Sequence, residues 1–465
     1  MYRVRNFGVI LITIAACSAG PVSADECTPP SDGPDVIAFT VSSHRVWGVV
    51  GDVSAHSIGT EMCNVGDEPL PWELGIAQNA YRLSNNRFEQ IGMSWIKKAI
   101  EVLGYDTCCP CISTGDIRIM GVGCSDAYHA ITNGAQSNLG PRSSINVFQG
   151  FVPDPSGQPG SNAIDRRMQI RVADLNPALN AGAMYFGEIQ LVTPDDAQYN
   201  SFNNISYSPF NVVFLPSAGT WGFSDTFTTL TRRPAIQAWA AHDPTVTVSE
   251  VDVPDEGRLY LGHRTSDNGD GTWHYEYALF NQNSHRSARR LSIPVPSGVT
   301  IRNIGFHDVD HHSGEPYDVS DWPGVHAGGE VRWATESFDA NPNANALRWS
   351  TLYNFRFDAN SPPAPAAIDI ELFLPGTPQL VIAQSVGPTY LVPVLSAAGL
   401  TLLAGLFMAV GACFTFRIRA RKCRLDWHCA PDDRRPVGLT MAFRKPASGS
   451  FRLKLRVSEV KSRSS

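Results

Sequence analysis

A long uncharged segment near the end of the chain places the strongest constraint on its fold. Residues 391–416 read LVPVLSAAGLTLLAGLFMAVGACFTF and contain no charged side chain. A helix rises about 1.5 Å per residue, so about 20 apolar residues cross the hydrocarbon core of a bilayer. The residues that follow are basic, as is typical of the cytoplasmic side of a membrane. They are Arg417, Arg419, Arg421, Lys422 and Arg424. The sequence therefore predicts one transmembrane helix at 391–416, with the preceding bulk outside the cytoplasm.

The N-terminus predicts export as well. Arg3 and Arg5 precede an apolar run at 7–16 that is too short to span a bilayer but suits the core of a signal peptide. Small residues then favour cleavage after Ala24, which makes residues 1–24 the signal peptide. The segment Ile-Ala-Ala-Cys that ends at Cys17 also fits a bacterial lipobox, and an uncleaved N-terminal anchor is a third alternative. All three place the bulk of the chain outside the cytoplasm.

Charge divides the chain at the same point. Residues 25–416 contain 21 Lys and Arg against 40 Asp and Glu, whereas residues 417–465 contain 14 against 4. An acidic exterior argues against nucleic acid and anionic lipid as its partners. The basic tail at 417–465 is expected to lie in the cytoplasm beside anionic lipid. We therefore expect a single-pass protein of a bacterial membrane, whose partners are the membrane at 391–416 and an extracellular ligand.

Six cysteines fall in the expected exterior, and all of them precede residue 125. An even number of cysteines in an exported chain predicts disulfide bonds. Three are crowded into one short segment, which also fits metal ligands. Because neighbouring cysteines rarely pair with each other, we expect these three to bridge to the other three. The six are Cys27, Cys63, Cys108, Cys109, Cys111 and Cys124.

The chain length and the turn-rich composition predict a mainly β fold with a few helices, in several domains. We expect a disulfide-stapled α+β region at 25–135, a middle α+β region at 136–244, a β-sandwich at 245–375 and a stalk at 376–390. Apolar residues at 3–4 spacing predict a helix over Phe88–Leu103, and Pro234–Ala241 predicts a short one. Residues 136–163 are rich in Ser, Gly, Pro and Asn and predict a long surface loop.

The β-sandwich is the most regular region. Short strands with alternating polarity, spaced by turns, indicate this fold. The expected strands are Thr245–Val251, Gly257–Thr265, Thr272–Asn281, Arg289–Pro294, Thr300–His307, Gly329–Ala334, Leu347–Phe357 and Ala367–Phe373. The segment at 267–271, Asp-Asn-Gly-Asp-Gly, predicts a hairpin turn, with a calcium loop as the weaker alternative. Recurrent aromatics fit either the core or an exposed ligand platform; they include Trp273, Tyr275, Tyr277, Trp322, Trp333, Trp349 and Tyr353.

The densest polar cluster follows the strand that ends at His307. Imidazole and carboxylate groups together suit Zn, Mn or Fe, and carboxylate with carbonyl suits Ca. The candidate ligands of a divalent metal ion are His307, Asp308, Asp310, His312 and Glu315. The alternative is a polar loop whose side chains satisfy backbone amides. The sequence gives no ligand signature that decides between the two.

No motif identifies catalytic or cofactor-binding residues. The chain lacks GxSxG, a P-loop and GxGxxG after a strand. Short strings such as His242-Asp243, Asp195-Asp196 and Cys124-Ser125-Asp126 occur too often by chance to indicate a catalytic pair. Enzymatic activity is therefore left open and is not favoured.

The C-terminal segment resembles bacterial protein-sorting tails. Val392-Pro-Val-Leu-Ser396 is similar to the Ile-Pro-Thr-Leu-Ser start of the IPTL type, and the apolar run followed by an arginine cluster is also similar to the PEP type. The resemblance implies that a membrane-bound sorting protease cuts near this motif. The chain differs in Val392 for Ile, in Val394 for Thr and in continuing beyond the basic cluster. These differences leave open whether a protease cuts the tail, but they do not affect the predicted membrane anchoring.

The exterior resembles uncharacterised secreted proteins of planctomycete-like bacteria over most of residues 55–375. The resemblance is clearest from Trp273 to Asn283 and from Gly305 to Asp310. It implies secretion and supplies no catalytic residue.

Three functions fit these features. The leading one is a membrane-anchored cell-surface or envelope protein with a structural, adhesive or ligand-binding exterior. The alternative is a metal-dependent extracellular enzyme centred on residues 307–321. The third is a sensor that signals through the basic tail, although the tail shows no recognisable domain.

Overall fold

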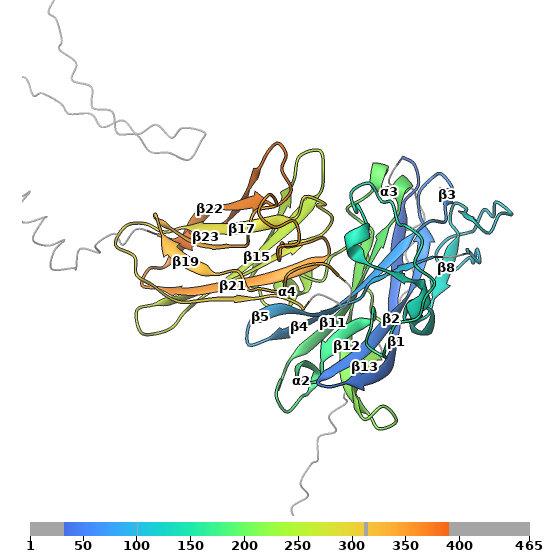
Figure 1. Ribbon diagram of the computed structural model, residues 1–465, viewed down its shortest axis with the longest axis horizontal. Coiled ribbons are helices and arrows are strands. Elements are labelled where there is room, and N and C mark those ends of the chain that lie inside the picture. Colours follow the sequence, from blue (N-terminus) through green and yellow to red (C-terminus); the bar gives the residue numbers. More distant parts are fainter. Residues whose placement is uncertain (1–31, 100, 311–314, 390–465) are drawn as a thin grey trace, which may run out of the picture. The chain divides into compact units, whose positions relative to one another are not determined.

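The structure, a computed structural model, describes residues 32–99, 101–310 and 315–389 (Figure 1). Within these ranges the chain is mainly β-structure, and its four α-helices have four to six residues each. The predicted signal peptide at 1–24, transmembrane helix at 391–416 and basic tail lie outside the described residues. Among the residues that are described, no helix is long and apolar enough to cross a membrane.

The first half of the described chain, which we call the N-terminal part, contains two larger sheets and one pair of short strands. One sheet contains β1 (Val36–Val50), β2 (Val53–Asn64) and β10 (Met168–Arg171), and β8 (Ser125–Tyr128) also pairs with β2. The other has the order β13 (Thr220–Asp225), β12 (Ile205–Leu215), β11 (Met184–Val192), β4 (Gly75–Ser84), β6 (Ile96–Lys98) and β9 (Leu139–Gly140), with β5 (Arg87–Met93) on β4. The short pair is β3 (Leu70–Pro71) and β7 (Ile119–Met120). Strands on both sides of the expected boundary at 135/136 therefore share a sheet.

The helix predicted over Phe88–Leu103 is wrong, because β5 and β6 occupy this segment. Residues three apart share a helix face but lie on opposite faces of a strand. Phe88 accordingly packs with Phe186 and Trp239 on one side, while Ile91 joins the core of the two larger sheets on the other. All residues of β5 after Arg87 are buried. Because β5 is covered on both faces, its apolar residues do not alternate strictly with polar ones. Their spacing therefore resembled the 3–4 spacing of a helix.

The short helices agree better with the sequence. The helix α4 (Gln237–His242) overlaps the predicted segment Pro234–Ala241, and α3 (Pro194–Tyr199) begins at a proline, which suits the first turn of a helix. The others are α1 (Ala130–Asn133) and α2 (Val172–Leu175). The loop predicted at 136–163 is partly internal, because Arg142, Ile145 and Val152 are buried.

The second half of the described chain forms two five-stranded sheets that share one hydrophobic core, and we call it the C-terminal sandwich. One sheet has the order β14 (Thr247–Asp252), β15 (Arg258–Asp267), β16 (Trp273–Asn281), β21 (Thr351–Ala359) and β18 (Ile301–His307). The other has the order β19 (Gly324–Ala327), β20 (Glu330–Ala334), β17 (Ala288–Pro294), β22 (Pro363–Leu372) and β23 (Leu380–Pro388). All eight predicted strands are present. The predicted stalk is wrong over 380–388, since β23 pairs with β22 along nine residues.

The aromatic residues of the sandwich belong to its core. Tyr275 stacks on Phe357 with ring centroids 4.8 Å apart, and Trp333 meets Phe355 edge to face at 5.3 Å. Trp322 is only 1% exposed. These rings are not available as an exposed platform. The turn at 267–271 joins β15 to β16, and Gly269 and Gly271 both adopt positive φ there, so the hairpin prediction is confirmed.

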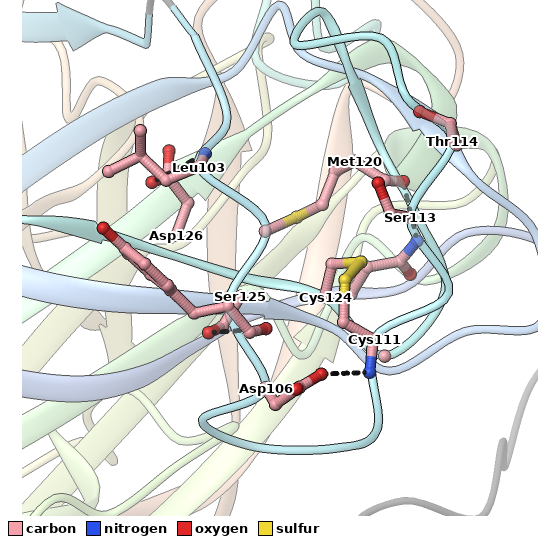
Figure 2. Close-up of a disulfide and its surroundings, with 12 residues drawn as sticks. Leu103, Asp106, Cys111, Ser113, Thr114, Met120, Cys124, Ser125 and Asp126 are labelled. Carbon is pink, nitrogen blue, oxygen red and sulfur yellow. Dashed lines mark hydrogen bonds between the residues drawn. A yellow bond between two sulfur atoms is a disulfide. The ribbon is translucent and has the colours of Figure 1, made fainter.

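Disulfide bonds join the crowded cysteines to distant ones. Cys63 pairs with Cys108 and Cys111 pairs with Cys124, while Cys109 is also disulfide-bonded. Cys27 lies outside the described residues. Figure 2 shows the Cys111–Cys124 bond beside Asp106, whose carboxylate accepts a 2.7 Å hydrogen bond from the backbone amide of Cys111. The predicted bridging pattern is confirmed for these two pairs. Sulfur atoms held in disulfide bonds are not available as thiolate ligands of a metal.

Candidate functional site

The four described candidate metal ligands turn toward different partners. Asp308 accepts a 2.5 Å hydrogen bond from the Asn345 amide, and Asp310 pairs with Arg171 at 2.6 Å. Glu315 accepts hydrogen bonds from the backbone amides at Arg142 (2.7 Å) and 143 (3.3 Å). Within 32–310 and 315–389, apart from residue 100, no group of three His, Cys, Asp or Glu side chains is placed to hold a metal. His312 lies outside these ranges, so the predicted metal site stays a prediction.

Three of the five candidates nevertheless share one cleft. His307, at the end of β18, and the following Asp308 and Asp310 line a cavity of about 280 Å³. Its other walls come from the N-terminal part, namely β2, β5, β10 and α2. They contribute Val53, Gln90, Ile91, Gln169, Arg171 and Asp174. The cleft therefore combines a loop of the sandwich with strands that lie over 130 residues earlier in the chain.

Burial shifts the pKa of two carboxyl groups, Asp308 and Asp174, which form the inner wall of the cleft. Burial raises the pKa of Asp308 to about 7, and the neighbouring charges of Asp321 and Asp310 raise it further, against the hydrogen bond from Asn345. Burial also raises the pKa of Asp174, while the nearby Arg82 and His307 oppose that shift. A carboxyl group that titrates near neutral pH can either accept or donate a hydrogen bond to a ligand. The inner wall thus presents, at Asp308, one carboxyl group whose proton can move near physiological pH.

The outer rim of the cleft is held by exposed ion pairs. Arg171 on β10 contacts Asp52 at 3.0 Å and Asp310 at 2.6 Å. All three side chains are more than half exposed, so these pairs contribute about 0–1 kcal/mol each to stability. Because Arg171 already faces two carboxylates, it adds little net positive charge to the cleft. The lining is acidic overall.

Behind the cleft a chain of ion pairs crosses from the N-terminal part to the sandwich. Arg82 pairs with Asp174 at 2.9 Å and with Glu89 at 2.8 Å. Burial would raise the pKa of Glu89, but the hydrogen bond from Arg82 and the charge of His307 bring it below its usual value. Arg87 then joins Glu89 at 3.3 Å to Glu276 on β16 at 2.8 Å.

The chain continues along the sandwich to a second, open pocket. His274 contacts Glu276 at 3.3 Å and Asp358 at 2.7 Å. Hydrogen bonds from the His274 imidazole to the carboxylates of Glu276 and Asp358 raise the pKa of His274, against the effect of burial. His274 and Asp358 line a pocket of about 500 Å³ beside the β15–β16 turn, which also includes Arg302 and Asn303. Charged side chains therefore connect the two cavities.

Hydrogen bonds between side chains and backbone groups join β5 to β21 and the residues just before it, along the seam on which the cleft lies. The Gln90 side chain accepts from the backbone amide of Leu352 at 2.8 Å and donates to the carbonyl of Ser350 at 3.2 Å. The Asn354 amide donates to the carbonyl of Phe88 at 2.9 Å. Gln90 is thus occupied by structural hydrogen bonds, and the groups left to meet a ligand are His307, Asp308 and the opposite wall.

Sequence reasoning found the sandwich wall of the cleft and missed the opposite one. His307, Asp308 and Asp310 were identified because they are neighbours in the sequence. Asp174 and Arg171 carry no local motif, and the segment that contains Gln90 was predicted to be helical. Only the tertiary packing that brings β5, β10 and the end of β18 around one cavity places these residues together.

Chemically, this arrangement suits binding better than any single reaction. The cleft offers carboxylates, an imidazole and amides around a small volume, and it has the size of a site for a small polar ligand. It contains no nucleophile paired with a base. No protein-family model matches this chain, and a comparison with curated proteins finds no significant relative.

Proposed function

We propose that this chain is an exported, membrane-anchored bacterial surface protein whose exterior binds a small polar ligand in the cleft around His307 and Asp308. The cleft carries the proposal, because it gathers titratable and hydrogen-bonding side chains from both halves of the described chain around about 280 Å³. Two disulfide bonds support export, since such bonds persist in oxidising compartments. The uncharged segment at 391–416 and the basic tail support anchoring.

The chemistry of the lining limits the ligand. Asp174, Asp308 and Asp310 accept hydrogen bonds, and the one guanidinium at the rim is already paired. A ligand with several hydroxyl or amine donors complements such a surface, whereas an anion does not. Val53, Ile91 and Val309 add small apolar contacts. A single sugar ring, neutral or amino-bearing, has the right size and the right donors.

Binding is tested with the full chain in detergent, titrated with glucose and glucosamine by isothermal calorimetry. We expect saturable binding of at least one sugar that His307→Ala or Asp308→Asn weakens about tenfold or more, the effect of losing one hydrogen bond to a charged group. The matched control is His326→Ala, an exposed histidine on β19. Equal binding by all four proteins, or none by the wild type, would disprove the sugar assignment.

The alternative is a metal-dependent extracellular enzyme, and one observation favours it: His307, Asp308 and Asp310 line the same cavity. Elemental analysis of the purified full chain decides the matter. Stoichiometric Zn or Mn that disappears in His307→Ala would favour the enzyme, while a metal-free cleft that still binds sugar supports the binding protein.

Export and topology are tested separately on intact cells. A protease added outside is expected to degrade the bulk of the chain and to leave a fragment with the basic tail protected. Full protection of the bulk would contradict the surface location without bearing on the cleft.

A further inference from the structure

A second polar cluster lies apart from the cleft, where the start of β1 meets α3 and the turn before β12. Asp35 precedes β1, Asp196 lies on α3, and Asn203 and Asn204 precede β12. Asp35 and Asp196 are 0% exposed and Asn204 is 4% exposed. Asn203 is half-buried, and only its side-chain oxygen is fully enclosed. The cluster therefore combines two buried carboxyl groups with two amides, from segments 160 residues apart.

Direct hydrogen bonds tie the cluster together. Asp196 accepts through Oδ2 from the backbone amide of Val36 at 3.3 Å and from the Asn204 side-chain amide. The Asn203 amide donates to Oδ2 of Asp35 at 3.1 Å. Each asparagine thus places its terminal amide group against one of the two carboxylates.

Three oxygen atoms of this cluster remain without a donor. Oδ1 of Asp196, Oδ1 of Asn203 and Oδ1 of Asn204 are buried and accept no hydrogen bond in the part of the chain that the structure describes. Buried polar atoms almost always have a partner, and leaving one without a partner destabilises the fold. Three such acceptors on neighbouring side chains indicate a missing positive group rather than three separate accidents.

The electrostatics agree with the hydrogen bonding. Burial raises the pKa of Asp196 well above its usual value, and the charges of Asp35 and Asp195 raise it further. Buried carboxylates are normally paired with a cation or bound to a metal.

We propose that Asp35, Asp196, Asn203 and Asn204 form a binding site for a hard divalent cation, for which Ca²⁺ is the best match. Carboxylate and amide oxygens with no nitrogen or sulfur donor are the ligands that Ca²⁺ prefers, and water or backbone carbonyls can complete its coordination. A cation would meet the three open acceptors and neutralise the facing carboxylates. Because the cluster contains only two carboxylates, its acidic residues alone would not identify it as a cation site.

The surrounding backbone is built to hold this cluster in place. A Cβ at Gly66 would lie 2.3 Å from the carbonyl oxygen of Gly33 and 2.5 Å from the amide nitrogen of Asp35, so only glycine allows this approach. The Asn64 side chain accepts from the amides of Asp35 at 3.3 Å and of Gly66 at 3.1 Å. Fixed ligand positions favour selective cation binding.

The first test uses the full chain after treatment with a chelator. Calorimetric titration with CaCl₂ is expected to show one equivalent of bound Ca²⁺ and a rise of the thermal unfolding midpoint. Asp196→Asn keeps the size of the side chain, removes a charge and is expected to weaken binding about tenfold or more. Asp339→Asn, at an exposed carboxylate outside both sites, is the matched control and is expected to bind as the wild type does. Absence of binding in the wild type, or unchanged binding in Asp196→Asn, would overturn the proposal.

A second variant keeps the proposal testable if Asp196→Asn does not fold. Asn204→Asp adds a carboxylate, so it is expected to strengthen Ca²⁺ binding about tenfold and to lower the unfolding midpoint only in chelator. In a cluster that merely forms hydrogen bonds, the added charge lowers the midpoint equally with and without Ca²⁺. That result would also overturn the site.

Discussion

The N-terminal part and the C-terminal sandwich bury different chemistry. The sandwich core consists of aromatic and aliphatic side chains, among them Tyr275, Trp333 and Phe355. The N-terminal part encloses charged and polar groups such as Arg142 and Glu188 besides its apolar core. An apolar core depends on filled volume, whereas a polar interior depends on matched donors and acceptors. The two parts should therefore respond to different kinds of change.

The largest effect is expected from a loss of volume in the sandwich. Trp333 is fully buried and contacts Phe355 and Phe357. Trp333→Ala should lower the free energy of unfolding by about 3–5 kcal/mol, because it removes a large ring and leaves a cavity. Urea unfolding followed by circular dichroism measures this loss. Trp273→Ala, at a half-buried ring, is the control and should cost clearly less; equal losses would contradict a volume-dependent core.

A somewhat smaller effect is expected where the N-terminal part depends on donor geometry. The Arg142 guanidinium donates to the carbonyls of Ser94 (2.6 Å) and Ser350 (3.3 Å), and to Gln78 O (3.1 Å) and Asn79 Oδ1 (3.0 Å). Arg142→Lys keeps the charge but cannot reach all four acceptors, so we expect a loss of about 2–3 kcal/mol. Arg332→Lys, at a side chain that is 47% exposed, should be neutral in the same urea experiment. A neutral Arg142→Lys would show that charge alone matters there.

Acid should affect the N-terminal part through the contact between the half-buried His44 and the fully buried His56. His44 Nε2 lies 2.9 Å from His56 Nδ1, and His56 Nε2 lies 2.6 Å from Ser54 Oγ. Burial lowers the pKa of His44 to about 3 and that of His56 well below its usual value. The unfolded chain therefore binds protons below about pH 6.5 that the native chain excludes, and stability falls as the pH drops toward 3.

This prediction gives a slope of up to about 1.4 kcal/mol per pH unit for each histidine in that window. Unfolding free energies measured at pH 7, 6 and 5 give the slope. His44→Gln should flatten it, and His326→Ala should leave it unchanged. A wild-type slope that His44→Gln does not alter would mean that other groups govern acid sensitivity.

The smallest effect is expected at His274 on the sandwich, and it has the opposite sign. Its pKa is raised by hydrogen bonds to Glu276 and Asp358, so its contribution is fully present at acid pH, below the unfolded value. That contribution is lost as the pH rises through the raised native pKa. Because the side chain is 31% exposed, solvent screens the effect, and His274→Gln should reduce the stability difference between pH 6 and 9 only slightly. A larger alkaline loss in the variant would contradict this sign.

The sequence predicted the sandwich well because polar and apolar residues alternate along its strands, even where most of these residues are buried. In β16 and β21 polar and apolar side chains alternate, and turns such as 267–271 mark the ends. The same reasoning failed for β5, which is covered on both faces. It also failed for β23, because its segment was interpreted as part of a stalk. Within the site, neighbours in sequence such as His307 and Asp308 were predicted together. Contacts such as Arg171 with Asp310 depend on tertiary pairing, which one sequence does not reveal.

The position of β23 determines where the protein can be shortened. This strand forms one end of its sheet, and Ser249 of β14 donates a 2.9 Å hydrogen bond to the carbonyl of Gln384 within it. A protease that releases the exterior by cutting upstream of 380 would strip this strand and leave β22 with open backbone groups, a template for aggregation. A cut beyond 389 would leave the sheet complete. A soluble shed form, natural or engineered, therefore has to retain residues up to the edge of the predicted membrane segment.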